Sequence, residues 1–260
     1  MSVPPYTPAH RLLEGKSVLV TAAAGTGIGF AAAKRCAEEG ARVVLSDAHE
    51  RRLHQAAEEL AKALNTSEKP KVIVCDVTVE EQVQRMIDFA AAELGGLDVL
   101  VNNAGLGGTA PIVEMTDAQW SKVLDVTLTG TFRCTRAALR YMTPRGRGVI
   151  VNNASVLGWR AQAGQAHYAA AKAGVMALTR CAAVEAAKAG VRVNAVSPSL
   201  AMHPFLAKVT TEDTLRELTA REAFGRPAEP WEVANVIVFL ASDYSTYMTG
   251  ENVSVSSQHP

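Results

Sequence analysis

Several features that would place a protein in a specialised class are missing from this 260-residue sequence. Its 26 Lys and Arg are balanced by 26 Asp and Glu, so the chain carries no charge excess for binding nucleic acid or an anionic membrane surface. No apolar run approaches the length of a membrane span. Residues 1–14 contain three prolines and no apolar core, unlike a signal or transit peptide. We therefore expect a cytoplasmic protein that acts on a small molecule, with neither nucleic acid nor membrane as a partner.

Cysteine is scarce, and its spacing argues against the usual metal sites. The four cysteines are Cys36, Cys75, Cys134 and Cys181, and they form no C-x-x-C pair and have no histidine at ligand spacing. Isolated cysteines of this kind are typical of reduced, mostly buried thiols in the cytoplasm. We expect no metal site.

The chain does have a regular alternation of short β-branched runs and longer helical patterns. The strand-like runs cover residues 17–21, 42–46, 71–75, 98–101, 148–152, 191–196 and 252–255. The helical patterns cover residues 28–39, 51–64, 80–94, 117–142, 167–188 and 231–241. Apolar strands alternating with helices predict an α/β fold, a doubly wound parallel sheet with helices on both faces. We expect a single domain over residues 15–260, preceded by an N-terminal extension of residues 1–14.

One stretch, residues 198–227, departs from this alternation. Ligands of doubly wound sheets bind beyond the carboxyl ends of the strands, and this stretch follows the sixth predicted strand. It is therefore predicted to form a short helical lid over the substrate. A surface excursion is the alternative.

A glycine-rich turn, TAAAGTGIG, runs from Thr21 to Gly29 after the first predicted strand. Glycines between a strand and a helix let backbone amides approach a pyrophosphate at the helix N-terminus, where the helix dipole favours anions. A tight turn alone would also explain them. Their place after the first strand of an alternating series favours a dinucleotide site.

Acidic and amide side chains follow the next three strands. Asp47 ends the second strand, where a carboxylate accepts hydrogen bonds from both ribose hydroxyls and repels a 2′-phosphate, so it favours NAD over NADP. Arg51 and Arg52 lie close by in the sequence, so NADP is not excluded. Asp76 is placed to hold the adenine amino group, and Asn103 to support the cofactor ribose. Helix capping is the alternative for both aspartates, and a plain turn for the asparagine.

The most informative chemical signal is the pair Tyr168 and Lys172, with Ser155 thirteen residues before the tyrosine. Four residues apart on a helix, the pair shares one face, so the ammonium is expected to lower the pKa of the phenol. The serine hydroxyl would hold a carbonyl or alcohol oxygen within reach of that phenol. This constellation suits proton transfer at a carbonyl oxygen while a hydride moves at the carbon. An amphipathic helix with a half-buried tyrosine and a solvated lysine is the alternative.

Together these motifs resemble the short-chain dehydrogenase/reductase family, in its single-domain branch. The likeness covers residues 15–256 and rests on the turn at 21–29, Asp76, the Asn-Asn-Ala-Gly at 102–105, Ser155, Tyr168 and Lys172. It implies a Rossmann-like sheet of seven strands and hydride transfer between NAD and a secondary alcohol or ketone. Tyr168 would be the general acid/base, Lys172 would lower its pKa and bind the nicotinamide ribose, and Ser155 would orient the substrate oxygen. It also implies a homotetramer or homodimer formed through the helices at 117–142 and 167–188.

The implied cofactor site draws on most strand ends. Its predicted members are Thr21, Gly25, Thr26, Gly27, Ile28, Asp47, Asp76, Val77, Asn103, Ala104, Gly105, Ser199, Ala201 and His203, in addition to Tyr168 and Lys172. The glycine turn departs from the family pattern, because Ala22 and Ala23 fill the region of its first glycine and the loop is one residue longer. Three single positions depart as well. Thr127 takes the slot of the family's fourth catalytic residue, an asparagine, where its backbone carbonyl would support a proton-relay water. Ser199 replaces a glycine, and His203 replaces the threonine that contacts the nicotinamide carboxamide.

The substrate is expected to be apolar and to contain rings. The predicted substrate residues are Leu106, Trp159, Gln162, Met202 and Phe205. Short motifs such as VTAAAGTGIG and EPWEVA resemble actinobacterial members of the family in cholesterol ring catabolism, which implies an alicyclic or steroid-derived hydroxyacyl-CoA. A 3-oxoacyl thioester reductase using NADPH is one alternative, against which Asp47 argues. A dinucleotide-sensing protein without catalysis is the other.

Overall fold

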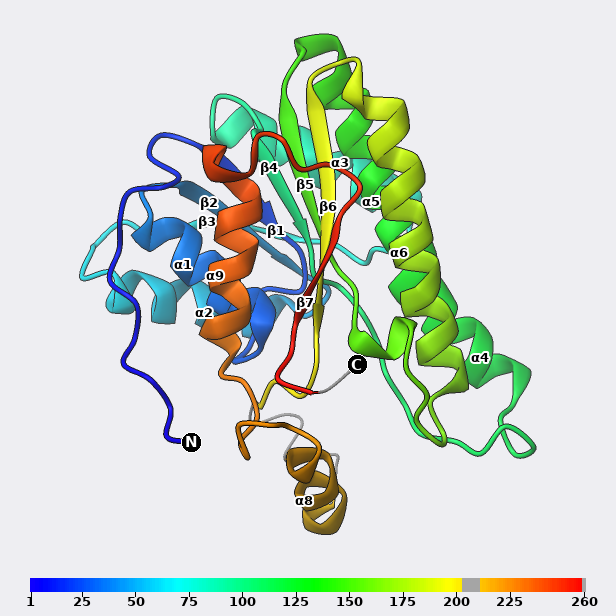
Figure 1. Cartoon of the computed structure of the whole chain (residues 1–260). Coiled ribbons are helices and arrows are strands. Elements are labelled where there is room, and N and C mark those ends of the chain that lie inside the picture. The colour runs from blue at the N-terminus through cyan, green and yellow to red at the C-terminus, as the bar shows by residue number, and fades with distance from the viewer. Residues whose placement is uncertain (203–210, 259–260) are drawn as a thin grey trace.

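The computed structural model describes residues 1–202 and 211–258, and its centre is one parallel sheet of seven strands (Figure 1). The strands are β1 Ser17–Val20, β2 Arg42–Asp47, β3 Lys71–Val74, β4 Val99–Asn102, β5 Gly148–Asn153, β6 Val191–Pro198 and β7 Asn252–Val255. Their order is β3-β2-β1-β4-β5-β6-β7, so the winding reverses between β1 and β4, where such sheets bind ligands. The predicted seven-stranded, doubly wound, single-domain fold is confirmed.

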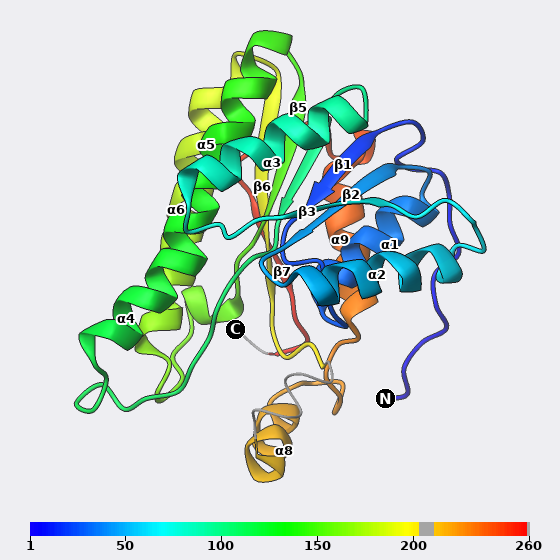
Figure 2. The same ribbon diagram turned by 180° about the vertical axis from the view of Figure 1, so that it is seen from behind.

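Helices cover both faces of this sheet (Figures 1 and 2). They are α1 Ile28–Glu38, α2 Glu50–Ala63, α3 Glu80–Glu93, α4 Asp117–Leu124, α5 Gly130–Met142, α6 Ala166–Ala187, α8 Glu212–Ala220 and α9 Pro230–Ala241. The apolar sides of α1, α2 and α9 share one core cluster, and those of α3, α5 and α6 share a second. The sheet therefore lies between two helical layers.

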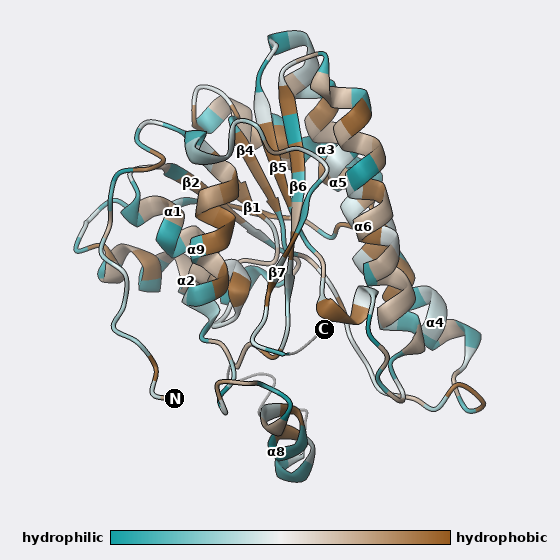
Figure 3. Cartoon of the chain, in the orientation of Figure 1, coloured by the Kyte–Doolittle hydropathy of each residue, from teal (hydrophilic) through white to brown (hydrophobic). Residues whose placement is uncertain are grey.

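Alternate residues of each central strand face these two layers. Val18 and Val20 of β1 belong to the cluster under α1 and α9, whereas Leu19 faces α3 and α5, and all three are fully buried. Figure 3 shows the central strands as largely hydrophobic, as expected for a parallel sheet with both faces covered. Each such side chain stabilises the fold by about 1.5–3 kcal/mol. The strand ends are thereby held rigidly where the site is built.

The helix predicted over residues 117–142 is interrupted. A π-helical turn, η1 Asp125–Thr129, separates α4 from α5. Thr127 lies in this turn, fully buried, and its hydroxyl bonds to the backbone of Leu106 in the loop after β4. π-Turns are rare and are frequent at functional sites.

The N-terminal extension lies along α1 and α9 (Figure 1). The ring of Tyr6 is centred 5.2 Å from that of Trp231 in α9. Glu39, at the end of α1, accepts two backbone amides of the extension and forms a 2.6 Å ion pair with Arg35, which is also buried. These contacts pack the extension onto the domain.

The stretch predicted to be a lid starts and ends at the carboxyl edge of the sheet. Ala201 and Ala228 pair through a β-bridge, and the Met202 amide donates to the Ala228 carbonyl, which closes the base of the stretch. Helix α8 lies between them and beyond the carboxyl ends of the strands (Figures 1 and 2). The predicted site residues His203 and Phe205 lie outside the described residues.

Candidate functional site

The structure brings Ser155, Tyr168 and Lys172 together at the carboxyl edge of β5. Ser155 lies just beyond β5, at the start of a 3₁₀ turn (η3, Val156–Gly158), and is 8% exposed. Tyr168 and Lys172 occupy the first two turns of α6, with the Lys172 ammonium 5.5 Å from the centre of the Tyr168 ring. The buried ammonium also donates a hydrogen bond to the Asn153 carbonyl. The alternative of a solvated lysine is therefore wrong.

Burial dominates the electrostatics of this trio. It lowers the pKa of Lys172 to about 8, because a desolvated ammonium is disfavoured. It also raises the pKa of Tyr168, and a hydrogen bond with the Ser155 side chain acts in the opposite direction. The prediction that Lys172 lowers the phenol's pKa below its ordinary value is thus wrong for the chain by itself. A phenol kept protonated is suited to donate to a carbonyl oxygen.

The glycine turn has the shape required to hold a pyrophosphate. Gly29 lies so close to the Ala22 carbonyl and the Asn103 amide that a Cβ would collide with both. Gly25 has φ +131°, which suits glycine, whereas Ala22 is held at φ +49°. The N-cap of α1, Gly27, has no side-chain cap, so the first-turn amides remain open to an anion. Thr26 is exposed beside them, and Ile28 begins the helix. These residues fit a dinucleotide phosphate.

Asp47 lies at the end of β2 and is 9% exposed. Its Oδ2 accepts the Ala24 amide of the glycine turn at 3.2 Å, and its Oδ1 accepts the His49 amide at 2.9 Å. Burial raises the pKa of Asp47, while the Ala24 amide, the Arg52 charge and the Ala48 amide oppose the rise. The N-cap of α2 is His49, so the alternative in which Asp47 caps that helix is wrong. The carboxylate instead fixes the glycine turn to the end of β2.

Asp76 and Val77 follow β3 with different surroundings. The Asp76 carboxylate accepts the amide and the hydroxyl of Thr78, at 2.9 and 2.7 Å, which closes a turn before α3. The N-cap of α3 is Val79, so Asp76 does not cap the helix itself. The Val77 side chain is buried against Gly130, which leaves its backbone as the part available to a cofactor.

Amide side chains connect the lysine to the glycine turn. Asn153 Nδ2 donates to Asn103 Oδ1 at 2.9 Å, and Asn103 Nδ2 donates to the Ala22 carbonyl at 3.1 Å. The amides of Asn103 and Ala104 both donate to the Thr21 hydroxyl at 3.0 Å. The alternative of a plain turn at Asn103 is therefore incomplete, because the Asn103 side chain connects the ends of β1, β4 and β5. Sequence reasoning missed Asn153, since only its place beside Lys172 gives it a role.

Thr127 holds the loop after β4 rather than exposing its hydroxyl. The hydroxyl accepts the Leu106 amide at 2.9 Å and lies 3.1 Å from the Leu106 carbonyl, to which it donates. Its own carbonyl accepts the Thr131 hydroxyl at 2.8 Å. A Cβ at Gly105 would lie 3.5 Å from the Lys172 ammonium and 3.7 Å from Thr127, so Gly105 separates the two.

The predicted substrate residues border the same edge from three segments. Leu106 and Gln162 are half-buried, Trp159 is 48% exposed, and Met202 is half-buried at the base of the lid stretch. Ser199 donates its amide to the Val255 carbonyl, and Ala201 is buried. Ala201 belongs to the core cluster shared by α1, α2 and α9, whereas Leu106, Trp159, Gln162, Ser199 and Met202 belong to none of the core clusters.

A buried polar cluster near this edge was not predicted. Glu222, 4% exposed, accepts hydrogen bonds from Ser257 at 2.7 Å and from Gln258 at 2.9 Å. Arg160, after Trp159, donates to the same Gln258 side chain. The cluster joins the end of α8, the C-terminal residues and the loop after β5, and nothing in the spacing of these residues indicates it.

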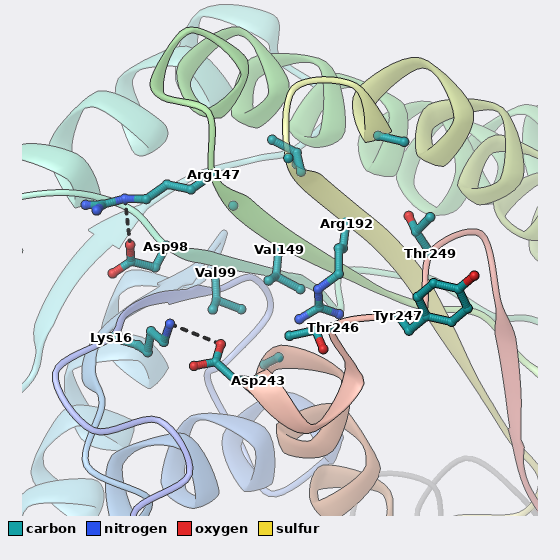
Figure 4. Close-up of a pocket in the computed structure, with 15 residues that line it drawn as sticks. Lys16, Asp98, Val99, Arg147, Val149, Arg192, Asp243, Thr246, Tyr247 and Thr249 are labelled. Atoms are coloured by element: carbon teal, nitrogen blue, oxygen red, sulfur yellow. Dashed lines mark hydrogen bonds and ion pairs between the residues drawn. The ribbon is translucent and has the colours of Figure 1, made fainter.

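A cavity of about 620 Å³ lies at the opposite, amino edge of the sheet (Figure 4). Its charged groups are paired: Lys16 with Asp243 at 3.4 Å and Arg147 with Asp98 at 3.6 Å. Arg192 donates to three acceptors at the end of α9 and the turn after it. Because doubly wound sheets bind ligands at the carboxyl edge, this cavity is separate from the candidate site.

Two observations concern only residues 1–202 and 211–258. No helix there is long and apolar enough to cross a bilayer. Within the same ranges, no three His, Cys, Asp or Glu side chains are grouped as a metal ion would require.

The comparisons with known proteins agree with this geometry. Residues 22–257 match the family model described as enoyl-(acyl carrier protein) reductase. The chain is 64% identical over 253 residues to the (5R,7aS)-5-hydroxy-7a-methyl-1-oxo-2,3,5,6,7,7a-hexahydro-1H-indene-carboxyl-CoA reductase of Mycobacterium tuberculosis, covering 96% of this chain and 95% of the relative. A crystal structure of a short-chain dehydrogenase from Mycobacterium smegmatis superposes with a TM-score of 0.88 at 58% identity, covering 100% of this chain and 99% of the other. An NAD⁺-bound xylitol dehydrogenase superposes with a TM-score of 0.87 at 32% identity, covering 94% and 99%.

This similarity over nearly the whole chain, together with the Ser155, Tyr168 and Lys172 site, decides for an enzyme over a binding protein. The chain belongs to the short-chain dehydrogenase/reductase family and is an NAD(P)-dependent oxidoreductase.

Proposed function

We propose that this enzyme uses NAD to interconvert a ring hydroxyl and a ketone on an apolar, alicyclic or steroid-derived acyl-CoA. The observation that carries the proposal is the 64% identity, over 96% of the chain, to a reductase named for a methyl-oxo-hexahydroindene carboxyl-CoA. The half-buried and exposed apolar residues at the carboxyl edge, among them Trp159 and Met202, support a ring-containing substrate.

The proposed chemistry assigns one task to each residue of the trio. Bound nicotinamide dinucleotide supplies or accepts the hydride. Ser155 donates its hydroxyl proton in a hydrogen bond to the substrate oxygen, which fixes that oxygen beside the phenol. Tyr168 gives its proton to the oxygen during reduction and takes it back during oxidation. Lys172, mostly protonated at neutral pH because its pKa is about 8, stabilises the phenolate that Tyr168 becomes.

The preference for NAD rests on Asp47. Its carboxylate is fixed at the end of β2 by two backbone amides, beside the turn that fits the phosphates. A carboxylate held there accepts ribose hydroxyls and repels a 2′-phosphate. Likewise, Thr127 is proposed to act by holding the Leu106 loop beside Lys172.

The decisive experiment follows coenzyme reduction by the purified enzyme with NAD and NADP in parallel. The substrates are bicyclic ring alcohols, each as the free acid and as the CoA thioester. Turnover with NAD and only with the thioesters is expected. Turnover confined to NADPH with acetoacetyl thioesters would overturn the proposal in favour of a 3-oxoacyl reductase. Tyr168→Phe is the control: it should lose turnover yet bind NADH, measured by fluorescence, as the wild type does.

A further inference from the structure

The imidazole of His167 lies between the general acid and the loop after β4. It is 2% exposed, and its Nδ1 accepts the backbone amide of Tyr168 at 2.9 Å. On the other side, its Nε2 faces Gly108, where a Cβ would come within 3.2 Å. A neutral imidazole that accepts at Nδ1 carries its proton at Nε2.

The Tyr168 amide needs such an acceptor. It belongs to the first turn of α6, where backbone amides have no partner within the helix. The N-cap residue, Gln165, makes no capping hydrogen bond. Its side chain instead donates to the Thr109 hydroxyl at 3.0 Å. His167 therefore supplies the acceptor for the amide of the residue that carries the reactive phenol.

The His167 ring and a backbone hydrogen bond join the start of α6 to the loop after β4. The Ala110 amide donates to the Gly164 carbonyl at 3.0 Å, just before α6. At its other end the loop is held by Thr127 through Leu106. A Cβ at Gly107 would lie 3.8 Å from the Tyr168 ring, so the loop passes beside the phenol. The position of Tyr168 relative to this loop thus depends on the first turn of α6.

We propose that His167 is a positioning residue for the reaction: by accepting the Tyr168 amide at Nδ1 and packing against Gly108, it fixes the phenol beside Ser155 and the loop after β4. This proposal rests on the proposed function only for the substrate used to measure turnover. Its structural part concerns the phenol itself, which can be observed without substrate.

Three substitutions separate the hydrogen bond from the shape of the ring. His167→Ala removes both. His167→Phe keeps a ring but has no acceptor. His167→Asn places its Oδ1 where the imidazole has Nδ1, and so keeps the acceptor. Gln165→Ala is the matched control on the same turn, because it removes a surface contact and leaves the Tyr168 amide bonded to His167.

The first measurement is the ultraviolet titration of Tyr168, obtained as the wild-type signal minus that of Tyr168→Phe and repeated in each background. Because burial raises the pKa of Tyr168, a phenol released toward solvent should titrate at lower pH. We expect this in His167→Ala and His167→Phe, and a titration near that of the wild type in His167→Asn and Gln165→Ala.

The second measurement is turnover, with NADH affinity followed by fluorescence. Misplacement of a reacting group by about an ångström costs up to roughly a hundredfold in rate, so kcat should fall about ten- to a hundredfold in His167→Ala and His167→Phe. The Kd for NADH should change less than about threefold, and His167→Asn should recover most of kcat.

Equal titrations and rates in His167→Phe and the wild type would overturn the proposal, because the ring alone would then suffice. So would a His167→Asn enzyme as impaired as His167→Phe. If His167→Ala fails to fold, the comparison of His167→Phe with His167→Asn still tests the proposal. If no substrate is turned over by the wild type, the titration tests the positioning role on its own while the proposed function fails separately.

Discussion

The ammonium of Lys172 in α6 donates a hydrogen bond to the backbone carbonyl of Asn153 at the end of β5. The side chain of the same asparagine donates to Asn103, which in turn donates to the carbonyl of Ala22 in the glycine turn. One chain of hydrogen bonds therefore runs from the Lys172 ammonium to the place proposed for the coenzyme phosphates. The position of the lysine depends on groups from three strand ends, and not on α6 alone.

The buried ammonium should make stability depend on pH. The pKa of Lys172 is about 8 in the folded chain, below the ordinary 10.5 of an unfolded one, so the unfolded state binds more protons between these values. The cost of burying the charge is fully present below pH 8 and is relieved as pH rises toward 10.5. By linkage this relief amounts to about 3 kcal/mol at most. Urea unfolding of wild type and Lys172→Met at pH 7.5 and 9.5 measures it.

In that comparison all other titrating groups contribute equally to both proteins. The stability of the wild type relative to Lys172→Met should therefore increase from the lower pH to the higher. A difference that does not change with pH would mean that the ammonium is solvated in the folded enzyme.

Substitution of Asn153 should lower both the stability of the fold and the affinity for NADH. Asn153→Ala leaves the carbonyl that holds Lys172 but removes the donor to Asn103 Oδ1. Leaving this half-buried acceptor without its donor costs up to about 3 kcal/mol, and we expect the Kd for NADH to rise roughly five- to twentyfold as the glycine turn loosens. Thermal unfolding and fluorescence titration measure the two effects.

Asn235→Ala is the matched control for this change. Among the described residues, Asn235 also makes one side-chain hydrogen bond, to Thr7, and has a buried Oδ1 without a partner, but it lies in α9. It should lose stability without a change in NADH affinity. If both variants bind NADH as the wild type does, the chain of amides is structural only.

The sequence predicted the sheet well because each strand is a short apolar run bounded by a turn, and the strands β1, β2, β4 and β6 are buried on both faces along most of their length. The sequence predicted less where the local structure depends on contact between two segments that are far apart along the chain. The helix over 117–142 contains no proline or cap that would mark η1, because Thr127 is turned toward Leu106 only after the loop and the helix have packed together. Composition alone does not report such a contact.

The same limit applies to the site. Spacing on a helix was enough to pair Tyr168 with Lys172, but the direction of the phenol's pKa depends on how deeply α6 is packed. His167 and Asn153 gave no signal in the sequence. His167 acts on a backbone amide, and Asn153 holds Lys172 through its own backbone carbonyl. A sequence motif defined by side chains carries no information about hydrogen bonds to backbone groups.

Coenzyme choice should respond to the charge of Asp47. Asp47→Asn keeps the size of the side chain and an oxygen acceptor but removes the negative charge. A hydrogen bond to a charged group contributes about 1.5–3 kcal/mol, so the ratio of kcat/KM for NAD over NADP should fall roughly 10- to 100-fold. Steady-state kinetics with both coenzymes measure it. Asp76→Asn, after β3, is the control: it should lower kcat/KM for both coenzymes and leave their ratio unchanged. An unchanged ratio in Asp47→Asn would remove the basis for preferring NAD.

The outer surface of α4, α5 and α6 should be an interface between copies of this chain. It carries large apolar side chains that are exposed in the single chain: Trp120 at 39%, Phe132 at 40% and Val184 at 78%. Apolar groups concentrated on one helical surface mark interaction sites.

Light scattering coupled to gel filtration should give a dimer or tetramer for the wild type and smaller species for Val184→Glu, because a charge would be buried there without a partner. Lys62→Glu, on α2 beyond the opposite face of the sheet, changes the net charge by two units, against one for Val184→Glu, at an exposed position and should leave the mass unchanged. A wild type that elutes as a monomer, or a Val184→Glu variant of unaltered mass, would show that this surface does not hold the copies together.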